Sequence, residues 1–479
     1  MRLNNGLSKW RIKFLNPTKF WTIFFVIISA LIRGICYIIQ IPPWYSPDEV
    51  SHFSYVRKLT NNGSKISISE HSRLPEGSKI PTTKRLHSIN EFQQKNKTWQ
   101  EISRSMEEFN FSIVYPDLLI SSGDINNKER APLYYFVSFA VIKLLGVKSL
   151  IGQFYLCRII SMLFGIGIII ITFFTAHTIF PKNFLLSISC TLLISLIPQS
   201  TLIHSSVNAD TMVNFLCSLF IFLIVKGVFS CQSKTLLILE ALTVFLAILA
   251  KRSAIILIPI WFLSIMLSYW NKGKRNWPAC ISAAVIITIT FSGTLVLIKE
   301  FFPSAFSRML EPFFKLSLYE NIIPYGGWLK FHEHLFVSFV GVFGWLRFPL
   351  HGLWYYILAV LVFISILGLF KLFKNKQDNI TLHEAAKKQS LVILIIFFII
   401  TYLSVYLGYG VYYNMHAQGR YLLPSLVPIV ILFAAGLENI SNRNKKINFL
   451  IPSLLFLLAM DMVSLINYIF SSFHLLFLS

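Results

Sequence analysis

The sequence predicts an all-α polytopic membrane protein, with about eleven transmembrane helices and further interfacial helices in a large first external loop. Of the 479 residues, 55% are hydrophobic and only 13% are charged. Several apolar runs reach the roughly 20 residues needed to cross a bilayer. The basic residues fall mostly in short loops between these runs, which is the positive-inside distribution of membrane proteins.

The composition also argues against two other classes of protein. A net charge of +22 could suit nucleic acid, but charge placed in short loops beside apolar runs is typical of membrane topology, so we expect no nucleic-acid partner. The six cysteines lie in or beside apolar runs without C-x-x-C spacing. Disulfides and thiol-bound metals are therefore not expected.

The first segment sets the orientation of the chain. Residues 1–19 are basic, and the apolar run 20–41 that follows is too long for the core of a signal peptide. We expect this run to remain as a membrane anchor, with the N-terminus in the cytoplasm and the next loop outside.

The apolar run 131–145 decides the topology downstream, because it is short for a span. If it crossed the membrane, two basic clusters would fall outside, against the positive-inside rule. These clusters are Lys272, Lys274 and Arg275, and Arg443, Lys445 and Lys446. We therefore predict that this run lies at the interface, within an external loop 42–152 of a single membrane domain 1–479.

The remaining spans follow from that choice, and a second external segment is predicted at 300–350. The predicted spans after 20–41 are 153–180, 184–204, 208–229, 235–252, 254–271, 277–299, 351–372, 389–410, 421–439 and 447–470.

The first external stretch carries the first carboxylates of the chain. Ser46 and Pro47 are typical of a helix cap and first helical position, with Asp48 and Glu49 as acidic residues of the first turn. On such a helix His52 would share a face with both acids. The three side chains are predicted to face one cavity.

Other polar residues gather at the external ends of the predicted spans. An ionised side chain in the membrane centre costs about 2.5 to 3.5 kcal/mol, so such residues normally face a wet cavity and a partner. Carboxylates beside several cations suit a phosphate-bearing ligand together with a hydroxyl that loses its proton. The further candidates are Arg130, Asp210, Lys251, Arg252, Arg347, Gln418 and Arg420.

Each candidate also has a simpler structural explanation. The acids could complement helix dipoles, and Lys251 and Arg252 could extend toward lipid headgroups. The sequence His332-Glu333-His334 resembles a metal-ligand set, but its i, i+2 spacing puts the two histidines on different helix faces.

Five stretches of the chain form a recognisable set of motifs: Asp48-Glu49-Val50-Ser51-His52-Phe53, Arg130-Ala131-Pro132, the stretch 198–210, Phe343-Gly344-Trp345 and Gln418-Gly419-Arg420-Tyr421. Together they resemble a bacterial membrane protein family called domain of unknown function 2142, which is similar to the GT-C superfamily of membrane glycosyltransferases. The resemblance implies a GT-C-like fold, and a base or metal partner in the first external loop, matched by Asp48 with Glu49 beside it. It also implies a phosphate-holding cation at Arg130, a second acid at Asp210 and a lysine at Lys251. This chain departs from the superfamily in having Arg-Ala-Pro where a double proline follows the cation.

The leading interpretation is an inverting glycosyltransferase in the bacterial cytoplasmic membrane. It would move a sugar from a polyprenyl-phosphate carrier to a cell-envelope glycan or lipid acceptor on the external face. The protein itself would be in contact with membrane lipids. Alternatives are a polysaccharide polymerase or ligase, a transporter or flippase of lipid-linked glycans, and a non-catalytic scaffold.

The interpretation assigns a role to each candidate. No cofactor is required, but a divalent metal ion held by Asp48, Glu49 and His52 is left open. The catalytic set is Asp48, Glu49 and Asp210, with Asp48 as the base. The substrate- and phosphate-binding set is Arg130, Lys251, Arg252, Arg347, Arg420, His52 and Gln418.

Overall fold

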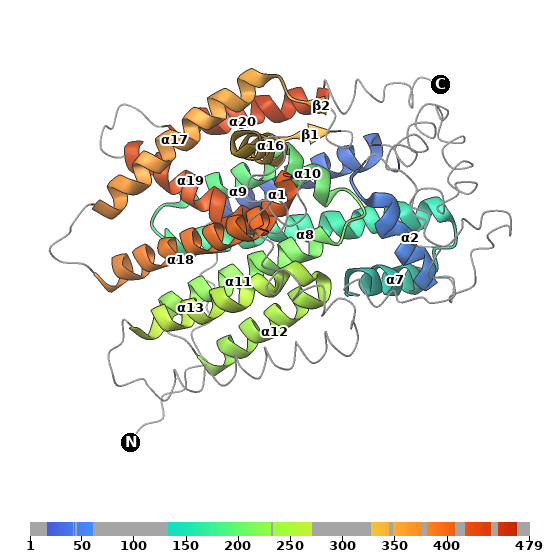
Figure 1. Cartoon of the computed structure of the whole chain (residues 1–479), viewed down its shortest axis with the longest axis horizontal. Coiled ribbons are helices and arrows are strands. Elements are labelled where there is room, and N and C mark those ends of the chain that lie inside the picture. Colours follow the sequence, from blue (N-terminus) through green and yellow to red (C-terminus); the bar gives the residue numbers. More distant parts are fainter. Residues whose placement is uncertain are drawn as a thin grey trace.

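The apolar runs form a bundle of long helices in the computed structural model of the chain (Figure 1). The structure describes residues 17–41, 43, 46–60, 133–230, 233–270, 327–343, 348–374, 381–407, 417–441 and 449–466. The elements of the first half are α1 (Pro17–Gln40), α2 (Glu49–Thr60), α7 (Leu133–Leu145), α8 (Leu150–Ile179), α9 (Phe184–Ser195), α10 (Pro198–His204), α11 (Asp210–Ser230), α12 (Lys234–Ala250), η3 (Arg252–Ile256) and α13 (Leu257–Trp270). Those of the second half are α16 (Gly327–Val340), β1 (Val342–Phe343), β2 (Phe348–Pro349), α17 (Gly352–Lys374), α18 (Leu382–Val405), η7 (Gly419–Ser425), α19 (Leu426–Ser441) and α20 (Leu450–Ser464).

The prediction of a helical protein with several membrane spans is confirmed. Six helical segments in the described part of the chain are long and apolar enough to cross a bilayer, and α9 with α10 makes a seventh if this pair, bent by 64°, counts as one span. The predicted spans 235–252, 254–271 and 447–470 correspond to shorter helices, and 277–299 lies outside the described residues. The total of about eleven therefore stays a prediction.

The ends of the spans gather at two opposite ends of the bundle (Figure 1). At one end Asn183, just before α9, donates to Glu438 near the end of α19 at 3.0 Å. At the other end the first third of α8 contacts the last residues of α1. Since α1 finishes where α8 begins, the chain between them returns to the same end, as expected if α7 lies at the interface.

Close helix packing depends on small residues where α17 crosses α19. A Cβ atom added at Gly368 would lie 1.9 Å from the carbonyl oxygen of Gly436. The side chain of Ser365 donates to the carbonyl of Phe433 at 2.9 Å. Small residues that let two backbones approach are typical of helix pairs in membranes.

The predicted external segment 300–350 contributes α16 and a minimal antiparallel ladder. In it Val342 pairs with Pro349 and Phe343 with Phe348, so the described chain is helical apart from these strands. The amide of Val342 donates to Gln199 of α10 at 3.0 Å. This contact attaches the segment to the bend between α9 and α10.

A buried arginine in α8 ties three segments together. Arg158 donates through Nε and Nη2 to the two carboxylate oxygens of Glu49, both at 2.8 Å, and through Nη1 to the carbonyls of Ile38 and Ile41 at 2.9 and 2.5 Å. Glu49 also accepts the amide of Val207, before α11, at 3.0 Å. Both charged side chains are fully buried. This arrangement fixes the end of α1, the start of α2 and the approach to α11 against one another.

Removing one partner of this pair should destabilise the protein strongly. Arg158→Met leaves the Glu49 carboxylate buried without its cation, which typically costs about 3 to 5 kcal/mol. Unfolding in detergent should therefore begin at a clearly lower temperature. Lys387→Met is the matched control, because its partner Glu384 is partly exposed at 3.5 Å and such pairs contribute less than about 1 kcal/mol. Equal effects of the two changes would contradict this role of Arg158.

Candidate active site

Asp48 occupies a strained turn at the entrance to α2. Its φ of 61° is the only positive value at a non-glycine residue in the described chain, and its carbonyl accepts the amide of His52 at 3.0 Å. The helix begins at Glu49, so the prediction that Pro47 opens it is wrong, and Asp48 is the residue that precedes the first turn. Backbone strain of this kind persists where the surrounding structure enforces it, often at functional sites.

Glu49 faces away from Asp48 into the protein. Its side chain is fully buried and held by Arg158 and the Val207 amide. The prediction that Glu49, Asp48 and His52 face one cavity is therefore wrong. Asp48 lies before the helix in a turned backbone, while the first helical turn directs Glu49 toward α8. This geometry gives Glu49 a structural contact instead of the catalytic or metal-binding position expected from the sequence.

Asp48 and Arg420 form an ion pair between the turn that precedes α2 and η7. Arg420 Nη2 lies 2.5 Å from Asp48 Oδ2; the arginine side chain is 7% exposed and the aspartate 43%. Burial opposes ionisation of Asp48, but Arg420, then His52 and finally Lys251 outweigh it and lower the pKa of Asp48 to about 2. Asp48 is therefore an anion at neutral pH.

A second ion pair lies within reach of the first. Asp210, at the start of α11, binds Lys251, which follows the last residue of α12. Lys251 also acts electrostatically on Asp48, and Arg420 acts on Asp210. The two acids and two cations, which we call the four-charge cluster, thus come from four separate segments.

The ring of Tyr421 lies near both cations of the four-charge cluster. Its centroid is 5.2 Å from the Arg420 guanidinium and 6.0 Å from Lys251 Nζ. Aromatic faces attract cations at such distances. Tyr421 therefore helps to hold both cations at the same edge of the site.

His52 lies beside the four-charge cluster as a further member of the site. It acts electrostatically on Asp48 and Asp210, and its Nδ1 lies 2.7 Å from the hydroxyl of Tyr135 in α7. The two rings stack with centroids 5.8 Å apart. Helix α7 therefore positions a side chain of the site.

The backbone of η7 is fixed by close contact with α16. A Cβ atom at Gly419 would lie 2.0 Å from the amide nitrogen of Phe339, so only glycine fits there. The Gly419 amide donates to Ser338 Oγ at 2.8 Å. Beside this anchor, Arg420 Nε and Nη1 and Gln418 Oε1 are buried without a hydrogen-bond partner among the described residues. Unused donors on a buried guanidinium suit an anionic ligand.

Not every predicted residue joins this group in the structure. Arg130 and Arg347 lie outside the described residues, and Arg252 opens η3 half-buried. Among the residues that the structure describes, no three His, Cys, Asp or Glu side chains come close enough to hold a metal ion. The proposed metal set of Asp48, Glu49 and His52 is not assembled in this geometry.

Sequence reasoning missed Arg158, Tyr135 and Tyr421. For Arg158 a signal existed, because an arginine inside a predicted span needs a buried partner. Tyr421 belongs to one of the motifs that carry the family resemblance, but neither tyrosine received a role, since tyrosines near span ends are commonly interfacial anchors.

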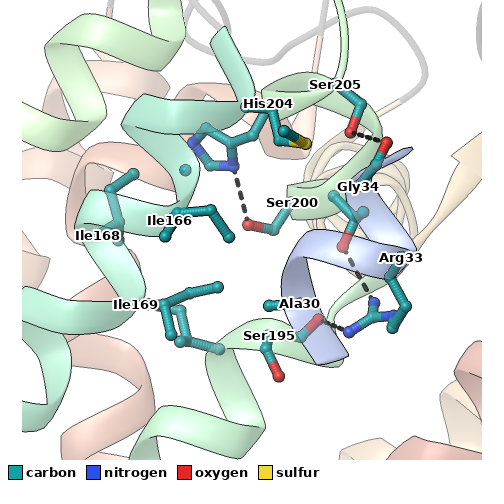
Figure 2. A pocket seen from close by; sticks show the side chains of 14 residues that line it. Ala30, Arg33, Gly34, Ile166, Ile168, Ile169, Ser195, Ser200, His204 and Ser205 are labelled. Atoms are coloured by element: carbon teal, nitrogen blue, oxygen red, sulfur yellow. Dashed lines mark hydrogen bonds between the residues drawn. The ribbon is translucent and has the colours of Figure 1, made fainter. Parts of the chain in front are cut away.

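A small cavity lined by both apolar and polar side chains lies among α1, α8 and the bend between α9 and α10 (Figure 2). Arg33 donates to Thr201 at 3.0 Å and to Asp461 at 2.8 Å, and Ser200 Oγ lies 3.2 Å from His204 Nδ1. The cavity of about 30 Å³ has room for one or two water molecules, whereas ligand pockets typically measure about 300 to 1,000 Å³. A larger ligand therefore does not fit in this cavity, and Asp48 and Lys251 are the exposed members of the four-charge cluster.

The ionisation of Asp48 should depend mainly on Arg420. In Arg420→Gln, the strongest influence that lowers the pKa is lost while burial remains, so the pKa of Asp48 should rise above its ordinary value near 3.8. Any stability that the pair supplies is present above the unfolded pKa and is lost as pH falls through about 2 in the wild type.

The measurement is the infrared band of the protonated carboxyl, assigned by subtracting the spectrum of the matching Asp48→Asn protein. Lys251→Met serves as the comparison, because Lys251 is the weakest of the three influences on Asp48 and should give a smaller rise. A larger rise in Lys251→Met than in Arg420→Gln would show that Asp48 does not rely on Arg420.

Comparison with known proteins identifies a family and gives several similar structures. ArnT from Cupriavidus metallidurans in the apo state matches with a TM-score of 0.46 and 13% identity, over 94% of this chain and 65% of that chain. The same protein bound to undecaprenyl phosphate matches with 0.39 and 15%, over 71% and 55%. The Archaeoglobus fulgidus oligosaccharyltransferase complex with Zn and sulfate matches with 0.39 and 11%, over 72% and 44%.

This chain thus spans less than two thirds of the length of each of these solved structures. No curated protein matches the sequence. Residues 31–429 match the family described as predicted membrane protein, DUF2142. The chain belongs to this family of membrane proteins.

Proposed function

We propose that this protein transfers a sugar from a polyprenyl-phosphate carrier to a hydroxyl of a cell-envelope glycan or lipid. The observation that supports this best is the four-charge cluster, in which two carboxylates and two cations from four segments meet at one end of the bundle. The proposal puts this end on the external face of a bacterial cytoplasmic membrane, with the N-terminus in the cytoplasm.

The cations supply what a departing phosphate needs. Arg420 uses Nη2 for Asp48 and keeps Nε and Nη1 without a partner among the described residues. Each of these spare N–H groups can donate a charge-assisted hydrogen bond to a phosphate oxygen. Lys251 is one-third exposed and adds a mobile charge. Preorganised cations of this kind stabilise a phosphate as the bond to the sugar breaks.

The acids supply the other half of the reaction. Asp48, Asp210 and His52 form the side of the cluster that can take up a proton from the acceptor hydroxyl and stabilise positive charge on the sugar ring. The acceptor oxygen then bonds to the anomeric carbon as the carbon–phosphate-oxygen bond breaks, and the electron pair remains on the phosphate. A single displacement of this kind inverts the configuration at the anomeric carbon.

The position of the cluster suits a lipid-linked donor. The cluster lies at helix ends beside α7, the short apolar helix expected at the membrane interface. A phosphate at that level can reach Arg420 and Lys251 while its hydrocarbon tail stays in the bilayer. The leading alternatives, polymerisation of lipid-linked glycans and their transport, share this donor chemistry and are distinguished by their products.

Asp48→Asn should have opposite effects on binding and on transfer. Transfer should be lost because the acidic side of the site loses a charge. Binding of undecaprenyl phosphate should become tighter by about two- to fivefold, because the phosphate no longer competes with Asp48 for Arg420. The gain is small because an ion pair with a partly exposed carboxylate contributes under about 1 kcal/mol. Titration of the purified protein with undecaprenyl phosphate measures the affinity. Weaker binding in Asp48→Asn would argue against competition between Asp48 and phosphate for Arg420.

The test of the function itself uses cells. A strain without the protein should lack one sugar mass in its envelope glycans by mass spectrometry, and wild-type protein or the Lys387→Met control should restore it. Asp48→Asn and Arg420→Gln should be produced in the membrane without restoring it. An unchanged glycan profile in the deletion strain would refute sugar transfer, and a change in chain length alone would favour a polymerase.

A further inference from the structure

The identity of the proton acceptor is a separate question from the reaction type. Asp48 is close to the proposed phosphate site, but it is held by Arg420 and its pKa is lowered to about 2. Asp210 is 6% exposed and is held by Lys251. Proton acceptors act best when their pKa lies near the working pH, so neither ion-paired carboxylate is well suited to the task.

His52 has the position and the chemistry that the two carboxylates lack. Imidazole is the side chain whose charge normally changes near neutral pH. His52 lies in the first turn of α2, one turn after Asp48, and is half-buried. It lies within electrostatic reach of both acids of the four-charge cluster. Two nearby carboxylates would stabilise the imidazolium that forms when His52 takes a proton.

The contact with Tyr135 orients the imidazole. Nδ1 lies 2.7 Å from the Tyr135 hydroxyl, and the stacked rings restrict rotation of the side chain. Tyr135 is 3% exposed and is packed against Tyr55, with ring centroids 4.4 Å apart, and Tyr134, with centroids 5.5 Å apart. A histidine whose Nδ1 donates to such a fixed oxygen keeps the lone pair on Nε2, as histidine bases in proteins do.

We propose that His52 Nε2 takes the proton of the acceptor hydroxyl, and that Tyr135 acts as a positioning residue by accepting a hydrogen bond from Nδ1. This inference rests on the proposed sugar transfer and names its base. The acceptor O–H bond breaks, its proton passes to Nε2, and the oxygen bonds to the anomeric carbon as the donor phosphate departs toward Arg420 and Lys251. The imidazolium then returns its proton to water.

A second histidine–tyrosine pair in the same protein provides a matched control. His332 of α16 lies 2.6 Å from the hydroxyl of Tyr402 through Nδ1, and its ring stacks on that tyrosine with centroids 5.9 Å apart. The pair has nearly the geometry of His52 and Tyr135 but is not part of the four-charge cluster. His332→Ala therefore removes a comparable contact without touching the proposed base.

The test measures transfer in isolated native membranes, whose own lipid-linked sugars serve as donor, by following the glycan mass that the deletion strain lacks. The wild-type rate should fall as the pH is lowered through the range in which an imidazole gains a proton. His52→Ala should lower the rate by about 10² to 10⁴-fold, lose this pH dependence and regain part of the rate with added imidazole. Its affinity for undecaprenyl phosphate should stay within twofold of the wild type, as should the rate of His332→Ala.

Tyr135→Phe tests the positioning role. Its rate should fall by about tenfold, the equivalent of one hydrogen bond. In ¹⁵N-histidine spectra at pH 8, the His52 signal is identified as the one that is lost in His52→Ala. In the wild type this signal should show a ring protonated at Nδ1. In Tyr135→Phe it should show a mixture of the two tautomers.

Three results would overturn the assignment. In the first, the His52→Ala protein transfers sugar at the wild-type rate. In the second, its rate is lower but keeps the wild-type pH dependence and is not restored by imidazole. In the third, the imidazole ring of His52 in the wild-type protein carries its proton on Nε2. Each of these leaves the sugar-transfer function standing, because the wild-type membranes still make the product. Failure of the wild-type membranes to make it removes the function and this assignment together.

Discussion

The pairing of Arg158 with Glu49 is the constraint on which the site depends. Burying both charges is costly, and it is tolerated because every oxygen of the carboxylate and three nitrogens of the guanidinium are hydrogen-bonded. Asp48 directly precedes Glu49, and Asp210 follows Val207 by three residues. The hydrogen bonds that join Arg158, Glu49 and Val207 therefore set the backbone position of both acids. The strained φ of Asp48 is the local result of holding Glu49 inward while α2 starts beside it.

The two cations are placed by different means. Lys251 follows the last turn of α12 in an extended conformation, and Arg420 lies in η7, whose backbone meets α16 at Gly419 with no room for a side chain. Because acids and cations are held by separate contacts, their side chains can exchange partners without moving the helices. Each acid is paired with one cation, and in the proposed function a phosphate would compete with the acids for these cations.

The sequence predicted several features of the fold and of the candidate site, and the features that it did not predict depend on contacts between distant segments. The distribution of Lys and Arg among the loops predicted that the start of α8 lies at the same end as the finish of α1, and that Asp48, Asp210, Lys251 and Arg420 meet there. Helical spacing alone could not say that Glu49 turns inward, because that depends on Arg158, more than one hundred residues away. Likewise, no local pattern pairs His52 with Tyr135, since 72 residues of undescribed chain, 61–132, separate their helices.

The neighbouring acids Asp48 and Glu49 differ in their environment because of burial and not because of residue type. Asp48 and Glu49 are adjacent and chemically alike, yet one is fully buried against an arginine that also caps α1, while the other is 43% exposed beside an arginine with unused donors. A carboxylate whose lone pairs are all satisfied inside the protein can only hold structure. One that keeps contact with solvent, next to a cation that still has donors to offer, can respond to a ligand. The same comparison separates Arg158 from Arg420, and it is why the proposed function gives the chemistry to the outer pair.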